Sequence, residues 1–217
     1  MIAALSVARY GRSLPLTRLP VDHGVTGLGM SDWSGYAERL ARVFSYRNTF
    51  YDEEPRFDLM APVPDELAGS CDFVLTSDVL EHVPPPVDVA LTHLRQLLKP
   101  GGLLVVTVPL RPDGPTEEHY PDLHDYAVTT LRSGPVLVNR SRDGTVEVFE
   151  DLVFHGGPGA TLEMRVFSLP DLVAGLHRAG FVDVTSCDQP VPEHGILWDH
   201  GPEWPVIARA PGDAASA

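Results

Sequence analysis

The stretch 71–110 constrains what this 217-residue chain can fold into more than any other segment. Residues 71–76 are an apolar run rich in β-branched and aromatic side chains, which is typical of a buried strand. The residues that follow have a helical period, because their apolar positions are spaced four, three and four apart: Val87, Leu91, Leu94 and Leu98. Residues 103–108 form a continuous apolar run, as a strand covered on both faces requires. A strand, a helix and a strand in this order predict a βαβ unit in a parallel sheet.

Polar residues gather where the two strands of this unit end. Ser77 and Asp78 follow the first strand. Glu81 and His82 come shortly after them, and Pro109 follows the second strand. Open parallel sheets bind their ligands beyond the carboxyl ends of the strands. We therefore expect this edge of the sheet to carry the functional site.

Local patterns outside the βαβ unit predict the rest of a mixed α/β fold. Residues 2–10 form a helix that ends at Gly11, and a capping pattern at residues 168–171 opens another helix. Two strand-like runs, 135–139 and 145–149, flank a short loop and predict a β-hairpin. The remaining strand and helix patterns cover residues 25–30, 33–44, 181–186 and 204–210.

The composition limits the partners and the location of the protein. A formal net charge of −14 repels phosphate backbones and anionic membranes, so we expect neither nucleic acid nor a membrane as a partner. No apolar stretch approaches the ~18 residues that a transmembrane helix needs. Cys71 and Cys187 sit in strand-like runs, as reduced, buried thiols do. We expect a cytoplasmic protein, and the sequence leaves a homodimer open.

Two longer strings carry a resemblance to a known family. DFVLTSDVLEHV followed by LKPGGLLVVTVP resembles the second half of class I S-adenosylmethionine (SAM)-dependent methyltransferases that act on small molecules, of the methyltransferase type 11 kind. The resemblance implies an α/β, Rossmann-like, three-layer fold with a mostly parallel sheet. We expect a single methyltransferase-like domain over residues 1–217, with a hairpin and a glycine-rich loop inserted at 111–167 and a frayed tail at 211–217.

A narrower resemblance covers nearly the whole chain. Its strings are similar to a bacterial methyltransferase-like group associated with glycosyltransferases and with surface or secondary-metabolite sugars: GLGMSDW, YRNTFYDEEPRFDL, HYPDLHDY, LVNRSRDGTVEVF, FHGGPGATLEMRVFS, GILWD and PVIAR. The standard glycine-rich cofactor loop is reduced in that group. The resemblance implies secondary metabolism as the setting.

The mapping of the family's cofactor site onto this chain leaves alternatives open. In the family, a glycine-rich turn follows the first strand, and acids after the second and third strands contact the ribose and the adenine. Residues 25–31 resemble the second strand, which puts Gly29 at the position of the ribose acid, with Asp32 as a substitute if the loop path changes. No strand with a G-x-G turn precedes Val25. The chain then lacks the standard loop, uses Gly27–Met30 as that loop in a shortened fold, or receives an upstream segment from another protein.

The resemblance implies SAM as the cofactor. Asp58 fits the acid that contacts the adenine, and a loop-capping role fits it equally well. For His82, a role in locking the loop and a direct contact with the cofactor are both open. The residues that the resemblance assigns to the cofactor are Gly27, Gly29, Met30, Asp58, Ser77, Asp78 and His82.

Three histidines follow the second strand of the βαβ unit in the chain, on the ligand edge. We predict that His155, His124 or His119 is the general base of an acceptor pocket, because an imidazole titrates near neutral pH and accepts a hydroxyl proton. Residues assigned to the acceptor are Tyr126, Glu163 and Arg165, although the last two alternate in a strand-like run and are also placed to pair with each other. Two alternatives stay open: loop histidines that bond to the backbone, and a metal held by the histidines with Asp122 or Asp125. The spacing of the histidines matches no standard metal motif, so we expect no metal.

The favoured function is SAM-dependent methylation of a small hydroxylated acceptor, such as a sugar or a natural product. One alternative is a degenerate member of the fold that binds no SAM and serves as a partner or scaffold domain. Another is SAM-independent chemistry, such as lyase or isomerase work by the histidines.

Overall fold

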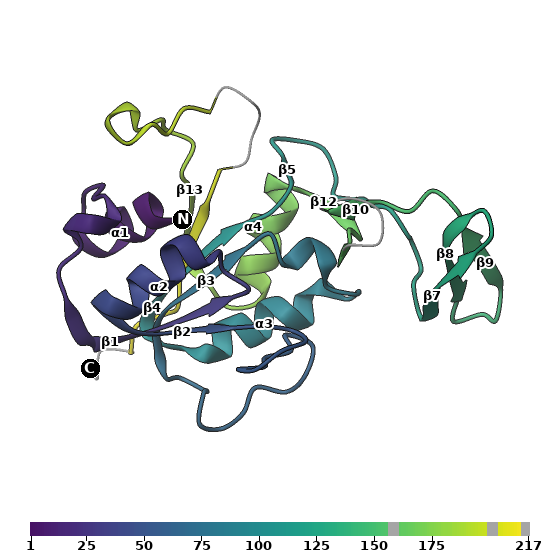
Figure 1. The fold of residues 1–217 in the computed structure, drawn as a ribbon, viewed down its shortest axis with the longest axis horizontal. Coiled ribbons are helices and arrows are strands. Elements are labelled where there is room, and N and C mark those ends of the chain that lie inside the picture. The colour runs from purple at the N-terminus through teal and green to yellow at the C-terminus, as the bar shows by residue number, and fades with distance from the viewer. Residues whose placement is uncertain (156–160, 199–203, 214–217) are drawn as a thin grey trace.

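A six-stranded sheet forms the centre of the protein in the computed structural model, which describes residues 1–155, 161–198 and 204–213 (Figure 1). The strand order is β13-β14-β4-β3-β1-β2. Four neighbouring strands run parallel: β2 (Phe44–Thr49), β1 (Asp22–Met30), β3 (Cys71–Ser77) and β4 (Leu98–Thr107). β14 (Val206–Arg209) runs antiparallel to β4, and β13 (Val182–Ser186) runs antiparallel to β14. The mainly parallel α/β sheet is confirmed.

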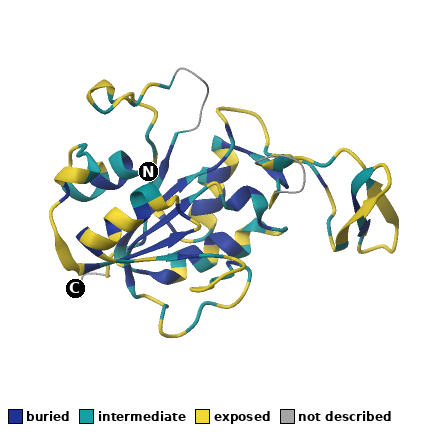
Figure 2. Cartoon of the chain, in the orientation of Figure 1, coloured by how far each residue is buried: buried dark blue, intermediate teal, exposed yellow. Residues whose placement is uncertain are grey.

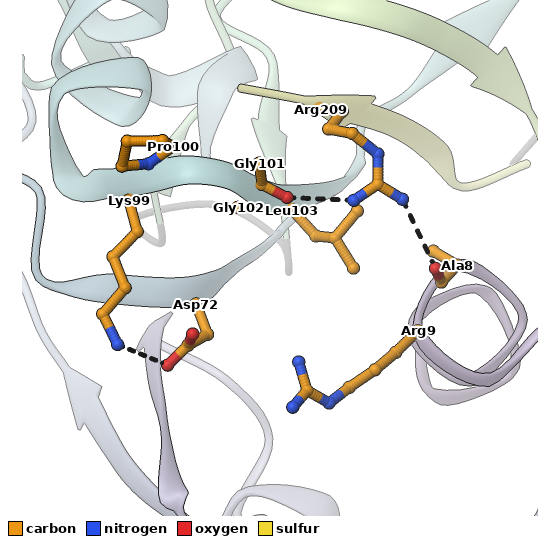
Figure 3. Close-up of a pocket in the computed structure, with 9 residues that line it drawn as sticks. All are labelled: Ala8, Arg9, Asp72, Lys99, Pro100, Gly101, Gly102, Leu103 and Arg209. Carbon is orange, nitrogen blue, oxygen red and sulfur yellow. Dashed lines mark hydrogen bonds and ion pairs between the residues drawn. The ribbon is translucent and has the colours of Figure 1, made fainter. Parts of the chain in front are cut away.

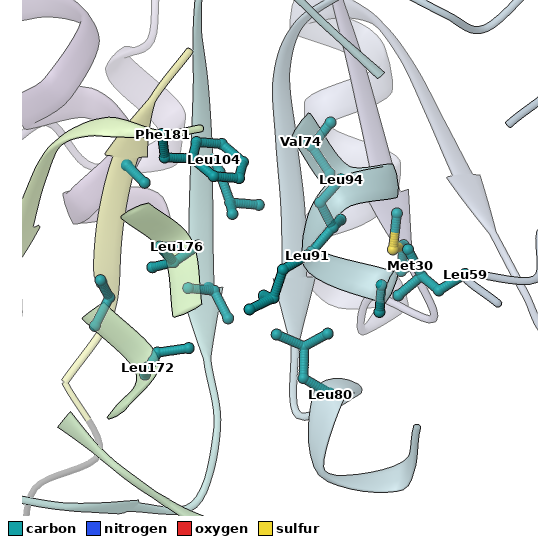
Figure 4. Close-up of a cluster of buried hydrophobic side chains, with 14 of the residues drawn as sticks. Met30, Leu59, Val74, Leu80, Leu91, Leu94, Leu104, Leu172, Leu176 and Phe181 are labelled. Atoms are coloured by element: carbon teal, nitrogen blue, oxygen red, sulfur yellow. The ribbon is translucent and has the colours of Figure 1, made fainter. Parts of the chain in front are cut away.

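Helices cover both faces of this sheet and complete three layers. α3 (Val87–Leu97) and α4 (Leu169–Arg178) pack on one face, where Figure 4 shows their leucines against strand residues. α1 (Ile2–Tyr10) and α2 (Ser34–Val43) pack on the other face. Side chains alternate along a strand. Val74 therefore belongs to the α3–α4 core, whereas Phe73 belongs to the core under α1 and α2.

The predicted helix boundaries have local causes. α1 ends where Gly11 adopts a left-handed backbone, with φ of 70°. α4 begins at Ser168, whose hydroxyl oxygen accepts a hydrogen bond of 3.2 Å from the backbone N–H of Asp171. Three short 3₁₀ helices complete the helical elements of the described residues: η1 (Leu16–Arg18), η2 (Leu80–His82) and η3 (Pro192–His194). Within the described part of the chain, none of the helices is long and apolar enough to cross a membrane.

The strand order of the central sheet reverses at β1. From β1 the chain passes through α2 to β2 on one side of β1, and then returns to β3 on the other side. β1 is therefore the first strand of this sheet in chain order and pairs directly with β3. The match of residues 25–31 to the family's second strand stays a prediction. Residues 50–70, which lead from β2 to β3, form turns and an isolated bridge between Phe50 and Arg56.

Gly27 and Gly29 lie within β1, where neighbouring side chains fill the space that a side chain would need. A Cβ atom on Gly27 would stand 2.2 Å from the ring of Phe73. A Cβ atom on Gly29 would stand 1.8 Å from the hydroxyl oxygen of Tyr46. These two glycines therefore let the core pack closely against β1.

The segment between β4 and α4 contains a separate three-stranded sheet. β7 (Asp125–Leu131), β8 (Gly134–Arg140) and β9 (Val146–Phe149) pair antiparallel and project from the body (Figure 1). Most of this sheet is more exposed than the central one (Figure 2). The predicted hairpin is confirmed as β8–β9, and β7 is an additional strand. The other short strands of the segment are β5 (Leu110–Arg111), β6 (Glu117–Glu118), β10 (Phe154–His155), β11 (Thr161–Leu162) and β12 (Arg165–Ser168). The glycine-rich turn at 156–159 and the last residues of the tail lie outside the described residues.

Candidate active site

The reversal of strand order between β1 and β3 marks a place for a ligand. Open α/β sheets bind ligands beyond the carboxyl ends of the strands at such a switch point. A cavity of about 650 Å³ opens there, and we call it the donor cavity. Residues that end or follow β1, β2 and β3 line it: Met30, Ser31, Asp52 and Asp78. Its volume lies in the range of small-molecule sites, which is roughly 300–1,000 Å³.

The remaining walls of the donor cavity come from segments distant in sequence. The connection after β2 contributes Asp58, Leu59 and Met60. η2 contributes His82, and β7 contributes Tyr126. The lining thus combines apolar side chains with the carboxylates of Asp52 and Asp58, a combination that suits a ligand with a flat ring and hydrogen-bonding groups.

A second cavity, which we call the acceptor cavity, opens over the tips of β3 and β4. Its volume is about 460 Å³, and its lining includes Ser77, Thr107, His155 and Glu163. Asp78 lines both cavities, so they meet at the tip of β3. Asp78 has a left-handed backbone, with φ of 54°, which is uncommon outside glycine and is found at functional turns. Its backbone N–H donates a hydrogen bond of 3.0 Å to the carbonyl oxygen of Thr107.

Asp32 lies in the loop after β1, and its hydrogen bonds are all made to other residues of the protein. Its side chain accepts a hydrogen bond of 2.6 Å from the hydroxyl of Tyr36 and another from Tyr46. The backbone N–H of Asp32 donates to Oδ1 of Asn48 over 2.9 Å. Burial raises the pKa of Asp32 to about 6, and the two tyrosine hydrogen bonds limit the rise. Asp32 therefore fixes the loop and does not stand in for a ribose-binding acid.

Asp32→Asn should remove a loss of stability that the wild-type protein undergoes as pH rises. A raised folded-state pKa means that the folded protein holds the proton more tightly, so wild-type stability falls as pH rises from about 4 to about 6. The shift from 3.8 to about 6 corresponds to a loss on the order of 3 kcal/mol. The free energy of unfolding of Asp32→Asn minus that of wild type should rise by this amount between pH 4 and pH 7 in urea titrations. A difference in the free energy of unfolding that does not change with pH would contradict a raised pKa of Asp32 in the folded protein.

Glu81 on η2 lies between two imidazole rings. Its side chain is fully buried, and Oε1 lies 3.3 Å from Nδ1 of His155 and 3.6 Å from Nε2 of His82. Burial, together with the nearby carboxylates of Asp78 and Glu163, raises the pKa of Glu81 to about 8. Burial also lowers the pKa of His82. His82 lines the donor cavity and His155 lines the acceptor cavity, so this group stands between the two.

The other predicted acceptor residues have different positions. His119 pairs with Glu163 over 2.9 Å, so it lies behind a residue of the acceptor cavity. His124 is exposed, and its backbone N–H donates to Oδ1 of Asn139 at the start of the β7–β8 pair. Of the three predicted histidines, the structure thus brings His155 to the lining of the acceptor cavity.

Arg165 is fully buried and has a structural role. Its Nε donates to a carboxylate oxygen of Glu118 over 2.7 Å. Its Nη1 donates to the carbonyl oxygens of Leu80 and Val83 over 3.0 and 2.6 Å. Arg165 therefore holds the turn after β3 in place, and the predictions that it binds an acceptor or pairs with Glu163 are wrong.

A third cavity, of about 260 Å³, lies at the opposite edge of the sheet (Figure 3). Lys99 pairs with Asp72 over 2.7 Å there. Arg209 donates to the carbonyl oxygens of Gly101 and Ala8, which ties α1 to the sheet. Arg209 thus serves the packing of α1, and Lys99 pairs within the sheet. The amino ends of parallel strands are not where such sheets bind ligands.

Asp52 was missed by the sequence interpretation, and Glu81 was placed on the ligand edge without a role. Asp52 follows β2 and lines the donor cavity. The sequence does contain a signal for Glu81. An acid in the apolar string VLEHV is buried with its neighbours, and a buried carboxylate is unusual enough to indicate a functional role.

The fold and the two adjoining cavities define an α/β protein with room for two small ligands at the tips of β1 and β3. A family model described as a methyltransferase domain matches residues 30–186, and the chain belongs to this family. It is therefore a methyltransferase, and SAM is its methyl donor. No functionally curated protein matches the sequence.

Solved structures share the fold at low sequence identity. The 1,6-didemethyltoxoflavin-N1-methyltransferase of Burkholderia thailandensis, solved with 1,6-didemethyltoxoflavin and S-adenosylhomocysteine, is 16% identical, with a TM-score of 0.51 over 97% of this chain and 76% of that one. A SAM-dependent methyltransferase from Clostridium acetobutylicum is 10% identical, with a TM-score of 0.51 over 86% and 84%. Streptomyces venezuelae DesVI is 16% identical, with a TM-score of 0.50 over 97% and 91%. These likenesses concern the Rossmann-like methyltransferase fold.

Proposed function

We propose that the protein methylates a hydroxyl group of a small acceptor, such as a sugar or a natural product. The donor cavity would hold the adenosyl part of SAM, and the acceptor cavity would hold the hydroxyl compound. The observation that carries this proposal is that Asp78 lines both cavities. Donor and acceptor bound in this way meet at the tip of β3, which supplies the proximity that an in-line transfer needs.

The chain's own residues suit the donor in kind and position. Asp58 would accept hydrogen bonds from the adenine amine, and Asp52 would accept them from the ribose hydroxyls. Met30 and Asp78 would border the methionine part, and His82 would close one side. Bound SAM supplies a methyl group on a positively charged sulfur. Ser77 contacts Thr107 over 2.9 Å and faces the acceptor cavity instead.

His155 would receive the proton that the acceptor hydroxyl loses. Its side chain is 46% exposed and lines the acceptor cavity. Nδ1 faces the buried Glu81 at 3.3 Å, so Nε2 on the other side of the ring is available to the acceptor. An ionised Glu81 would stabilise the imidazolium that forms, as the orienting carboxylate of other nucleophile–base sites does.

The acceptor cavity also supports a neutral, hydroxylated acceptor. Its polar lining includes Ser77, Thr107 and Glu163, which are hydrogen-bonding partners for hydroxyl groups. Trp198 adds an aromatic wall, and no described residue accepts a hydrogen bond from its indole N–H. A net charge of −14 disfavours polyanionic acceptors. The choice of a sugar or secondary metabolite rests on the resemblance to the glycosyltransferase-associated group.

The test is acceptor-dependent release of S-adenosylhomocysteine. The full chain would be incubated with SAM carrying an isotopically labelled methyl group and a panel of sugars and hydroxylated natural products. We expect a product that carries one labelled methyl group on oxygen, located by mass spectrometry and NMR. A product labelled on nitrogen or carbon would overturn the proposed acceptor class, and release that ignores every acceptor would overturn the proposed transfer.

Asp58→Ala should weaken binding of S-adenosylhomocysteine about tenfold or more. A hydrogen bond to a charged group contributes roughly 1.5–3 kcal/mol, and Asp58 lines the donor cavity. Isothermal titration calorimetry measures the change. The matched control is Asp65→Ala, which removes an exposed acid from the same connection and should leave the dissociation constant unchanged. Equal affinities for the two variants would assign Asp58 to the turn in which its Oδ1 accepts from the N–H of Met60 over 2.9 Å.

A further inference from the structure

Glu81 is a buried acid whose carboxylate oxygens lack hydrogen-bond donors among the described residues. Its side chain is 0% exposed, and no described residue donates a hydrogen bond to either carboxylate oxygen. The contact of 3.3 Å with Nδ1 of His155 is within ion-pair distance but lacks hydrogen-bond geometry. Buried carboxylates are paired, protonated or bound to a metal, because a lone buried charge is costly. Glu81 therefore carries either a proton or a bound cation at this position.

The nitrogens of two histidines face the same position. One atom each of Glu81, His82 and His155 lies within 4.8 Å of the other two. Tetrahedral zinc, with bonds of about 2.0–2.2 Å, holds its ligand atoms roughly 3.3–3.5 Å apart. The distances of 3.3 and 3.6 Å from Glu81 to the two nitrogens already match this spacing. The ring of His155 is half-exposed, so few packing contacts hold its orientation.

His82 is fixed in the tautomer that a metal ligand requires. Its Nδ1 lies 2.8 Å from the carbonyl oxygen of Leu162, and a carbonyl accepts hydrogen bonds, so Nδ1 carries the proton. The lone pair then remains on Nε2, the atom that faces Glu81. A ring N–H donated to a backbone carbonyl is the usual outer contact of a metal-binding histidine.

We propose that Glu81, His82 and His155 bind one divalent transition-metal ion of the zinc type. Two imidazole nitrogens and one carboxylate select such an ion over magnesium or calcium, which prefer oxygen ligands alone. Three protein ligands leave a fourth position open, toward the acceptor cavity that His155 lines. The sequence gives no hint of this site, because His155 is far from the other two ligands in the chain.

The inference goes beyond the proposed function and does not depend on it. A metal bound to Nδ1 of His155 leaves the ring's own proton on Nε2. Nε2 then has no lone pair with which to accept the acceptor's proton, so His155 cannot bind the ion and act as the base at the same time. The metal-bound form would therefore be a second state of the site, in which His155 does not act as the base. Because binding of the ion is measured without SAM and without an acceptor, it succeeds or fails separately from methyl transfer.

The experiment is a titration of the full chain, stripped with a chelator, with zinc chloride in a calorimeter. We expect one ion per chain. His82→Ala and His155→Ala should each weaken binding at least about tenfold, because each removes one of three ligands. Glu81→Gln keeps the shape of the buried side chain and removes the charge, and it should weaken binding as well. Circular dichroism confirms that each variant is folded.

A matched control and a second readout separate this site from adventitious binding. His23→Ala removes an exposed histidine of β1 and should leave zinc affinity unchanged. Cobalt(II) in place of zinc should give the visible spectrum of a four-coordinate ion in wild type, and His155→Ala should abolish it. Binding that is not saturable, or that is unchanged in both His82→Ala and His155→Ala, would overturn the proposal and assign the ion to other histidines among the nine of the chain.

Discussion

His155→Ala should lower the rate of methyl transfer about 100-fold or more while leaving the affinity for S-adenosylhomocysteine within about twofold. The imidazole lines the acceptor cavity, and it is the residue placed to take the proton from the acceptor hydroxyl. Proton transfer by a positioned side chain contributes roughly 10²–10⁴-fold to a reaction rate. The adenosyl part of the cofactor would occupy the donor cavity, where His155 is not among the lining residues.

Two measurements on the same variant make this prediction decisive. Single-turnover kinetics with the acceptor identified in the release assay gives the rate of transfer, and calorimetry gives the affinity for S-adenosylhomocysteine. His23→Ala is the control for loss of an exposed histidine and should retain the wild-type rate. An unchanged rate in His155→Ala would exclude it as the base, and a parallel loss of affinity would move it from proton transfer to cofactor binding.

Gly27→Ala should lower the free energy of unfolding by about 3 kcal/mol or more, at the upper end of overpacking effects. The added Cβ would stand 2.2 Å from the ring of Phe73, which is fully buried. That ring cannot move away easily, because it packs edge-on against Phe44 with centroids 5.3 Å apart and is stacked on Tyr46 at 6.0 Å. The strain would fall on the centre of the core under α1 and α2.

Urea unfolding monitored by circular dichroism measures this effect. Gly212→Ala is the control, because no heavy atom lies within 4 Å of the Cβ it would add. A double variant that combines Gly27→Ala with Phe73→Leu should be less destabilised than the sum of its single changes, because the smaller side chain makes room. A fully stable Gly27→Ala would contradict the close packing of β1 and reopen a role for this glycine in cofactor binding.

The elements that sequence patterns predict well are those with local causes. The βαβ unit shows in its apolar periods, and the start of α4 shows in the Ser168 cap. The β8–β9 hairpin shows in two short runs around a turn. Each of these features depends on residues within one or two turns of chain, which is the range over which propensity and patterning act.

The features that the patterns missed depend on long-range contacts. The sequence leaves a cofactor loop open as one role for Gly27 and Gly29, because a sequence does not distinguish a glycine that faces a ligand from one that faces Phe73. The place of β1 in the sheet follows from its pairing with β3, more than forty residues on. The approach of His155 to Glu81 likewise arises from the way β10 returns to η2.

A crystal structure with S-adenosylhomocysteine tests the central claim most directly, which is that the donor cavity at the tips of β1 and β3 holds the cofactor. We expect the adenine near Asp58, the ribose near Asp52 and the sulfur at Asp78, where the two cavities meet. Density for the ligand elsewhere on the protein, or an empty donor cavity at saturating ligand, would contradict the account.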